Sequence, residues 1–397
     1  MKDFNFNREA VKAQHGSEVC SALDEFYSLY TARLTKWIAS MWDKESGGFY
    51  FSRSAKQTEG FYADIESTGQ AIGVIQDLGL TPDPYYLPEQ IRCRVVEFLR
   101  EKQDPDGFFY HPQWGKDIST SRRARDLASA SWIIEGFGSS LKYPSALKQM
   151  EKAASGEGEY DVPEHLRSKE AFLAYLDGLD INRNSYPAGQ IIGMQAPQIK
   201  AVGLDKVCID YLNSKQYESG IWESELNYTS ANGVLKICHA YNALGADIPR
   251  LPLVVEAVLT TALSKDEPVA IVDVFNPLMA VHFLRNIISN TGRPERMADA
   301  ERIIKSKAVE LIRLTADKLR NFLCSDGAFS YTRIDAPRSE FSWSQGKIVA
   351  PAAIEGDMNA TQLARATQIL LTEALMLPVG APYTLDDADE FFGLFGT

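Results

Sequence analysis

Acidic residues recur where apolar segments of this chain begin. Asp64, Asp126 and Asp357 each stand close to Ser, Thr or Asn at the start of a run rich in small and aliphatic residues. Two carboxylates on opposite sides of a glycosidic bond hydrolyse it, with retention at about 5 Å separation and inversion at about 6.5 to 9.5 Å. We therefore predict a catalytic pair drawn from these three aspartates, with Glu66 and Asp273 as further acidic groups that bind the substrate.

The pKa values expected in such a cluster suit both roles of the pair. Like charges that face each other in a partly desolvated cup raise the pKa of one carboxyl group. Helix N-termini instead favour the ionised form, by about 0.3 to 1 kcal/mol each. One carboxyl group can therefore keep its proton as a general acid while another stays charged.

A second set of residues predicts a different reaction on sugars. Positions 182–186 read NRNSY and offer amide, guanidinium and phenol groups. Asn184 or an arginine would neutralise the carboxylate of a uronate, and Tyr186 would act as base and acid at C5. Arg122, Arg123 and Arg125, at the start of the second apolar segment, are suited to bind an acidic sugar or a diphosphate. The alternative prediction is a lyase that acts on uronate glycans.

Aromatic and amide side chains near the same segments complete the predicted substrate site. Acids with stacking aromatic rings and amides are the usual equipment of carbohydrate sites. The residues that we expect to bind substrate in this way are Tyr110, Trp114, Trp222, Tyr228, Trp343, Asn276 and Asn359.

Four short Gly-aromatic turns punctuate the chain at a regular interval. They are SGGFYF at 46–51, DGFFY at 106–110, SGIWES at 219–224 and DGAFSY at 326–331. With Gly48 as the reference in the first turn, the glycines are 59, 113 and 107 positions apart, or one, two and two units of about 55. Such a period indicates stacked units of supersecondary structure.

Six apolar segments begin after these turns or where a turn is missing, at positions 64, 125, 182, 227, 273 and 355. Their first residues are good helix caps, and Pro277 suits the first turn of a helix. The segments are apolar nearly all round, as buried helices are, whereas the segments before them are amphipathic. The pattern predicts an all-α fold, an (α/α)6 toroid of six outer and six inner helices. Its inner N-termini and Gly-aromatic turns would share one rim.

The strings FLREKQDPDGFF and YLNSKQYESGIW resemble the Gln-x(3)-Gly-x-Trp/Phe repeats of the terpenoid-cyclase and protein-prenyltransferase superfamily. They also resemble the turns of (α/α)6 glycosidases, 2-epimerases and polysaccharide lyases. This resemblance implies the toroid architecture over nearly the whole chain and identifies no single family. The turns serve structure first, because Gly permits the bend and the aromatic side chain packs between helices.

Motifs for metals and cofactors are missing. The chain has no DxDD or DDxxD motif, and its five histidines form no motif typical of the epimerases. Cys208, Cys238 and His239 do not make a zinc site, because the last two are adjacent on an apolar helix and point to different faces. The sequence predicts no cofactor and no metal.

The composition of the 397 residues limits the partners. A net charge of −12 opposes binding to nucleic acid and to anionic membranes. No stretch reaches the roughly 18 apolar residues of a membrane span, the Met1 end has no signal-peptide core, and the five cysteines form no CxxC pair. We expect a cytoplasmic protein whose partner is a small molecule or an oligosaccharide. The oligomeric state stays open.

We expect one domain over 1–397, with two rim insertions and a tail. The insertion near 143–167 lacks the third turn, and the one near 335–350 carries Arg338 and Trp343, which could close on a ligand. The acidic segment 384–397 is expected to be a solvated tail.

Four functions agree with these observations. The leading prediction is a glycoside hydrolase with a carboxylate pair, and the alternatives are the uronate lyase, a terpenoid cyclase or prenyl-binding toroid, and a toroid that binds without catalysis. A terpenoid site should be deep and aromatic with one acid, whereas a glycan site should combine acids, amides and stacked aromatics.

Overall fold

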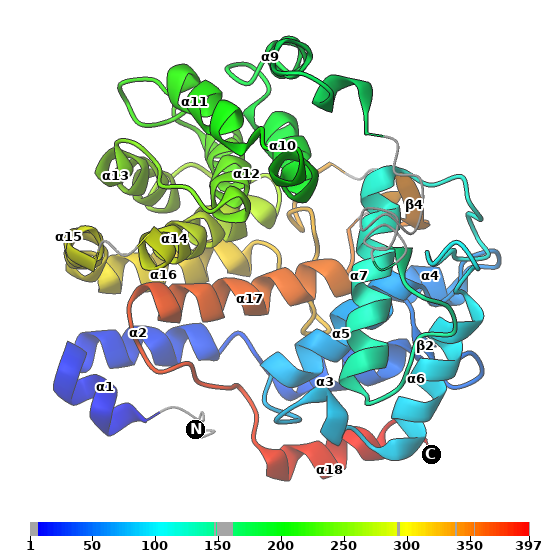
Figure 1. The fold of residues 1–397 in the computed structure, drawn as a ribbon. Helices are drawn as coiled ribbons and strands as arrows, with labels where there is room; N and C mark the ends of the chain where they lie inside the picture. Colours follow the sequence, from blue (N-terminus) through cyan, green and yellow to red (C-terminus); the bar gives the residue numbers. More distant parts are fainter. Residues whose placement is uncertain are drawn as a thin grey trace.

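The computed structural model describes residues 7–146, 148, 162–291, 294–337, 340–352 and 354–396. These residues are predominantly helical, which confirms the all-α class (Figure 1). The strands are short and form two antiparallel pairs, β1 (Trp42–Asp43) with β2 (Gly48–Phe49) and β3 (Ser342–Ser344) with β4 (Lys347–Ala350). No described helix is long and apolar enough to cross a membrane.

Each of the six predicted inner segments forms a helix. These helices are α5 (Ile65–Asp77), α7 (Thr120–Gly136), α10 (Ser185–Ala201), α12 (Tyr228–Leu244), α14 (Val272–Thr291) and α17 (Met358–Ala374). Side-chain caps fix several starts, as expected for polar residues at N-termini. Asp64 accepts from the Ser67 amide at 3.0 Å, and Asp357 accepts from the Ala360 amide at 2.7 Å.

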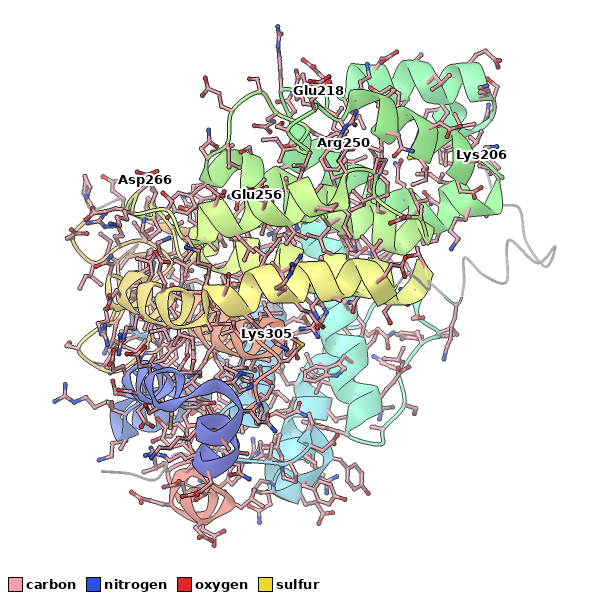
Figure 2. The ribbon with its side chains drawn as sticks, turned by 90° about the vertical axis from the view of Figure 1, so that its left-hand side faces the viewer. Lys206, Glu218, Arg250, Glu256, Asp266 and Lys305 are labelled. Atoms are coloured by element: carbon pink, nitrogen blue, oxygen red, sulfur yellow. The ribbon has the colours of Figure 1, made fainter. Side chains whose placement is uncertain are left out.

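A second set of helices alternates with these along the chain. It consists of α3 (Ala32–Met41), α6 (Glu89–Glu101), α9 (Lys169–Gly178), α11 (Asp205–Lys215), α13 (Leu251–Ala262) and α16 (Ala308–Arg320). Charged side chains such as Lys206 of α11 and Glu256 of α13 are exposed on these helices (Figure 2). The alternation of two sets of helices along the chain follows the sequence prediction, although α13 is itself largely apolar, with Glu256 as its one charged residue.

The shorter elements complete the fold. They are α1 (Arg8–His15), α2 (Ser17–Tyr27), α4 (Arg53–Gln57), the 3-10 turns η1 (Pro84–Tyr86) and η3 (Glu164–Leu166), α15 (Pro294–Ser306) and α18 (Leu385–Gly393). Helix α2 packs on α16, and α15 packs on α13 and α14.

The apolar helices pack on one another in a continuous series. Helix α7 contacts α5, α5 contacts α17, α17 contacts α14, α14 contacts α12, and α12 contacts α10. Figure 1 shows α17 between α14 and α5, so the last helix of the series in sequence lies beside the first. Helices α10 and α12 approach most closely because Gly189, Gly193 and Gly233 face the partner helix; a Cβ on Gly233 would lie 1.6 Å from the Ser185 hydroxyl.

The Gly-aromatic turns need glycine because the backbone is left-handed there. The φ angles are 82°, 83°, 89° and 91° at Gly47, Gly107, Gly220 and Gly327. The glycine of the first turn that corresponds to Gly107, Gly220 and Gly327 is therefore Gly47. The spacing in the sequence analysis was counted from Gly48 instead. The third residue of each Gly-x-aromatic unit is buried, so these aromatic rings are core residues: Phe49, Phe109, Trp222 and Phe329.

Three of these turns are seated on a neighbouring outer helix. A Cβ on Gly47 would lie 2.6 Å from the carbonyl oxygen of Arg94 in α6, and one on Gly220 would lie 2.8 Å from Cβ of Leu253 in α13. A Cβ on Gly327, which follows α16, would lie 2.7 Å from the amide nitrogen of Leu34 in α3. The final turn of the chain therefore packs on the first of the outer helices.

Two predicted helix starts were wrong in detail. Helix α7 begins at Thr120, because Ser119 caps it by accepting from the Arg122 amide at 3.0 Å. Asp126 consequently lies in the second turn and is not a cap. Helix α14 begins at Val272, which places Pro277 inside the helix and not in its first turn.

The predicted insertions and tail are structured where they are described. Positions 342–350 form the β3–β4 hairpin, whereas Arg338 lies outside the described residues. In the segment 143–167, positions 147 and 149–161 lie outside them too. The segment predicted to be a solvated tail contains α18, whose Phe391 is buried, and Phe395 beyond it packs on Trp42 with ring centroids 5.7 Å apart.

Candidate functional site

One large cavity lies among the apolar helices. It encloses about 1180 Å³, and residues from α5, α7, α10, α12, α14 and α17 all line it, together with Tyr331 and the β3–β4 hairpin. On each of α7, α12 and α14 the lining residues recur at intervals of three and four, so one face of each helix points inward. Helices that are far apart in the sequence, such as α5 and α17, thus line the same cavity, as the sequence analysis predicted.

The cavity is deep as well as wide. Its lining on α5 runs from Glu66 through Gly69, Gln70 and Gly73 to Asp77. At 1.5 Å per residue these residues extend about 16 Å along the helix axis. Small residues on α5 and on α7, where Ala128 lines the cavity, leave room between the helices. The space suits an extended ligand of several rings.

Two cationic side chains and a phenol meet in this cavity. Lys236 of α12 lies with Nζ 5.0 Å from the centroid of the Tyr186 ring. Arg125 of α7 is close enough to affect the pKa of both residues. Burial, reinforced by Arg125, lowers the pKa of Lys236 to about 8. A lysine with this pKa is partly neutral near physiological pH and can accept a proton.

The phenols in the cavity hold their protons more tightly than usual. Burial raises the pKa of Tyr186, although Arg125 opposes this effect. Burial also raises the pKa of Tyr331 to about 12, with Tyr186 as the next cause. Both phenols therefore keep their protons at neutral pH, and Tyr186 lies beside a lysine that can act as a base.

Arg125 and Glu66 connect the cavity to the hairpin. Arg125 Nη1 donates to Glu66 Oε1 at 2.6 Å, and Ser344 Oγ donates to Glu66 Oε2 at 3.0 Å. The Arg125 side chain remains 44% exposed, so its guanidinium can also contact a ligand. Trp343, next to Ser344, lines the cavity with 63% of its surface exposed and offers an open aromatic face.

The carboxylates predicted as catalytic point elsewhere. Asp64 and Asp126 lie around the buried guanidinium of Arg122, which contacts Asp64 Oδ1 at 3.0 Å, Glu66 Oε2 at 3.0 Å and Asp126 Oδ2 at 3.2 Å. Trp114 covers the same guanidinium at 4.4 Å. The structure thus brings five predicted residues together, but as a closed ion-pair cluster beside the cavity.

Burial raises the pKa of two of the carboxyl groups that were predicted to be catalytic. It raises the pKa of Asp126 to about 7, although Arg122 lowers it. It also raises the pKa of Asp357 to about 7, against the backbone N–H groups of Ala360 and Tyr331. Asp357 accepts from the Tyr331 amide at 2.7 Å in addition to capping α17. Neither residue is among those that line the cavity.

Several other predicted substrate residues serve the fold. Trp222 is buried and donates to the Leu212 carbonyl at 2.9 Å, and Tyr228 donates to the Asp266 carbonyl at 2.8 Å. Asp273 accepts from the amides of Val269 and Ala270 at 2.9 and 3.0 Å. Tyr110 donates to Asp106 at 2.8 Å, and Asn184 is an exposed residue before α10.

The cavity holds six residues that the sequence predicted and several that it did not. The predicted ones are Glu66, Arg125, Tyr186, Asn276, Asn359 and Trp343. The others with polar or aromatic side chains include Gln70, Trp132, Asn232, Lys236, His239 and Tyr331. A single lysine in the apolar segment NGVLKICHAYNALG was the available signal for Lys236.

Glu66 and Asp77 are the acidic residues that line the cavity within the described chain. They lie on the same side of α5 and are about 16 Å apart along its axis. Glycosidase carboxyl groups lie no more than about 9.5 Å apart. These two residues therefore cannot form a glycosidase pair.

Two further hollows lie away from this cavity. One of about 570 Å³ is on the outside of α6 and includes Arg92 and Cys93. The other, of about 440 Å³, contains His282, which lies 3.3 Å from Glu373. In the described part of the chain, no group of three or more His, Cys, Asp or Glu side chains is placed to hold a metal ion.

Comparison with protein-family models and with curated proteins finds no match to this chain. The function must therefore be argued from the cavity itself.

Proposed function

We propose that the six helix pairs close into an (α/α)6 toroid and that the cavity is its funnel. The contact between α17 and α5 supports closure at one junction, and the turn at Gly327 that packs on α3 supports it in the outer layer. The remaining junction is between α7 and α10, where Gln190 Nε2 lies 3.4 Å from Ser121 Oγ. A chemical cross-link between Ser121→Cys and Gln190→Cys, in a background without the native cysteines, would support closure. Failure to cross-link would contradict it.

We propose that the protein is a lyase that cleaves a uronate-containing oligosaccharide by β-elimination. The observation that carries this proposal is the meeting of Arg125, Lys236 and Tyr186 in one deep cavity. β-Elimination at a uronate needs a cation for the carboxylate, a base for the C5 proton and a donor for the leaving oxygen. Arg125 supplies the positive charge, the lowered pKa of Lys236 suits a base, and the raised pKa of Tyr186 keeps its proton in place for donation.

The reaction balances with these groups alone. Arg125 binds the uronate carboxylate and stabilises the charge that develops as the C5 proton leaves. Neutral Lys236 takes that proton, the electron pair forms the C4=C5 double bond, and the C4–O4 bond breaks. Tyr186 gives its proton to O4, and proton transfer from the Lys236 ammonium to the Tyr186 phenolate restores both groups. The products are a shortened glycan and an unsaturated uronate.

Hydrolysis by a carboxylate pair has less support, although it was the leading prediction from sequence. Asp64, Asp126 and Asp357 are engaged in caps and ion pairs, and Glu66 and Asp77 are too far apart. A terpenoid site has less support too, because amides, cations and acids line much of the cavity.

Binding without catalysis is the second candidate. Asp64 and Glu66 contact the guanidinium of Arg122. Asp273 and Asp357 accept from backbone amides. Acids that are each paired in this way are expected of a binding scaffold. A partner that is a small oligosaccharide fits both candidates. All five cysteines are free thiols, which agrees with the proposed cytoplasmic location.

The test is a product screen with polyuronates, mixed uronate glycans and neutral glycans, read by the ultraviolet absorbance of the unsaturated product. Lys236→Met and Tyr186→Phe should abolish product formation, whereas Lys206→Met on the outer side of α11 should not (Figure 2). Saturated products would mean hydrolysis. Stabilisation by uronate glycans without any product would mean a binding protein, and stabilisation by prenyl diphosphates alone would favour the terpenoid function.

A further inference from the structure

Amide side chains form one wall of the cavity. Gln70 of α5 donates from Nε2 to Asn359 Oδ1 of α17 at 3.0 Å, and Asn276 of α14 donates from Nδ2 to Asn232 Oδ1 of α12 at 2.8 Å. All four residues line the cavity. We call this set (Gln70, Asn359, Asn276 and Asn232) the amide wall.

The amide wall has an unused hydrogen-bonding group. Gln70 is 7% exposed, and its Oε1 atom is buried without a hydrogen-bond partner among the described residues. A buried acceptor without a partner is destabilising, so a ligand that supplies a donor is favoured there. The carboxylate of a uronate has only acceptors and would be repelled by this oxygen. A sugar hydroxyl supplies the missing donor.

The surroundings of the amide wall are suited to an uncharged sugar ring. Phe275 and Met279 of α14 line the cavity next to Asn276 and offer apolar contact to the C–H face of a ring. The cationic groups Arg125 and Lys236 come from α7 and α12, whereas Gln70 and Asn359 come from α5 and α17. Asn232 of the amide wall lies one turn before Lys236 on α12, so the wall adjoins the cationic groups. The cavity therefore has one part that favours an anion and another that favours hydroxyl groups.

We infer that the amide wall binds an uncharged sugar residue adjacent to the uronate, so that the substrate is a mixed glycan and not a polyuronate. This inference rests on the proposed function, because it places the uronate at Arg125 and Lys236. It adds a specificity-determining role for Gln70 and Asn359, which bind substrate without taking part in proton transfer.

Isothermal titration with three disaccharides tests the inference. The probes are glucuronosyl-xylose, digalacturonate and cellobiose. The native protein should bind glucuronosyl-xylose about ten-fold more tightly than digalacturonate, and Gln70→Met should remove that preference. Lys236→Met should weaken both charged ligands and leave their ratio unchanged. Gln90→Met, an exposed substitution on α6, is the matched control and should change neither.

The outcomes separate this inference from the proposed function. Equal binding of the two charged disaccharides, or a preference that survives in a folded Gln70→Met variant, would overturn the mixed-glycan specificity and leave the lyase proposal standing. Binding of cellobiose alone, lost in Gln70→Met, would support the amide wall as a sugar site and contradict the proposed reaction. Thermal unfolding of each variant shows that the changes do not come from loss of fold.

Discussion

The Nζ atom of Lys236 lies over the ring of Tyr186, 5.0 Å from its centroid, where α12 meets α10. The approach is possible because these two helices are packed through glycines, with Gly189 against the backbone of Ile237. Lys236 is therefore partly buried beside a phenol that is 38% exposed. The lowered pKa of Lys236 makes its neutral amine available as a base, and the raised pKa of Tyr186 keeps the phenol protonated as an acid at neutral pH.

The first prediction concerns the pH dependence of glycan cleavage. The pKa of Lys236 is about 8, so kcat/KM should rise with pH as Lys236 loses its proton around that value. It should fall again above about pH 10, because the pKa of Tyr186 is raised from its ordinary value. Initial rates on a uronate oligosaccharide measure this profile. Lys236→Met should lower kcat by about 100-fold or more and remove the rising limb; an unchanged rising limb in that variant would exclude Lys236 as the base.

The second prediction separates Arg125 from its neighbour Arg123. Arg125→Gln should raise KM for a uronate substrate by about 10- to 100-fold, since it removes a charge-assisted hydrogen bond to the carboxylate. Arg123→Gln is a matched control, because Arg123 lies over the ring of Phe108 and does not line the cavity. Steady-state kinetics of the two variants give the comparison, and equal effects would contradict the assigned role of Arg125.

Much of the helical framework could be predicted from the sequence, because local rules govern it. Asp64, Asn227 and Asp357 cap the helices that the sequence analysis expected them to open. The start of α7 was expected at Arg125, but Ser119 caps the helix six residues earlier. In the structure Asp64, Glu66 and Asp126 compensate the positive charge of Arg122, and two of these acids lie far from α7 in sequence.

The cavity was harder to predict than the helices. The sequence analysis placed the chemistry at the helix N-termini, where polar residues are clustered. The cavity in fact extends down the inward faces, where Gln70 of α5 and Lys236 of α12 lie beyond the first turns of their helices. Which face of such a helix points inward depends on the packing of its neighbours, and helix periodicity alone does not contain that information.

The third prediction tests the close packing of α10 on α12. A Cβ at position 233 would lie 1.6 Å from the Ser185 hydroxyl and 2.6 Å from its Cβ, so Gly233→Ala should destabilise the protein by about 1 to 3 kcal/mol. Gly178→Ala is the control, because a Cβ at the end of α9 meets no atom within 4 Å. It should be neutral or stabilise by about 0.4 to 1 kcal/mol. Urea unfolding of both variants measures the difference, and equal stabilities would contradict the packing.

The fourth prediction concerns the carboxylates around Arg122. Three carboxyl groups contact this one buried guanidinium, so one of them should keep a proton, and burial raises the pKa of Asp126 to about 7. The unfolded chain releases that proton at its ordinary pKa of about 3.9. Between these values the folded state binds more protons than the unfolded state, and the free energy of unfolding therefore falls as the pH rises from about 4 to about 7.

Asp126→Asn isolates this contribution because an amide does not titrate in that range. The variant should lose less stability than the native protein between about pH 4 and about pH 7, by on the order of 2 kcal/mol. Asp386→Asn in the exposed first turn of α18 should leave the native pH dependence unchanged. Urea unfolding at both pH values gives the four free energies. If the native protein and Asp126→Asn lose the same stability, Asp126 is ionised in the fold and the carboxylates around Arg122 share its charge without a proton.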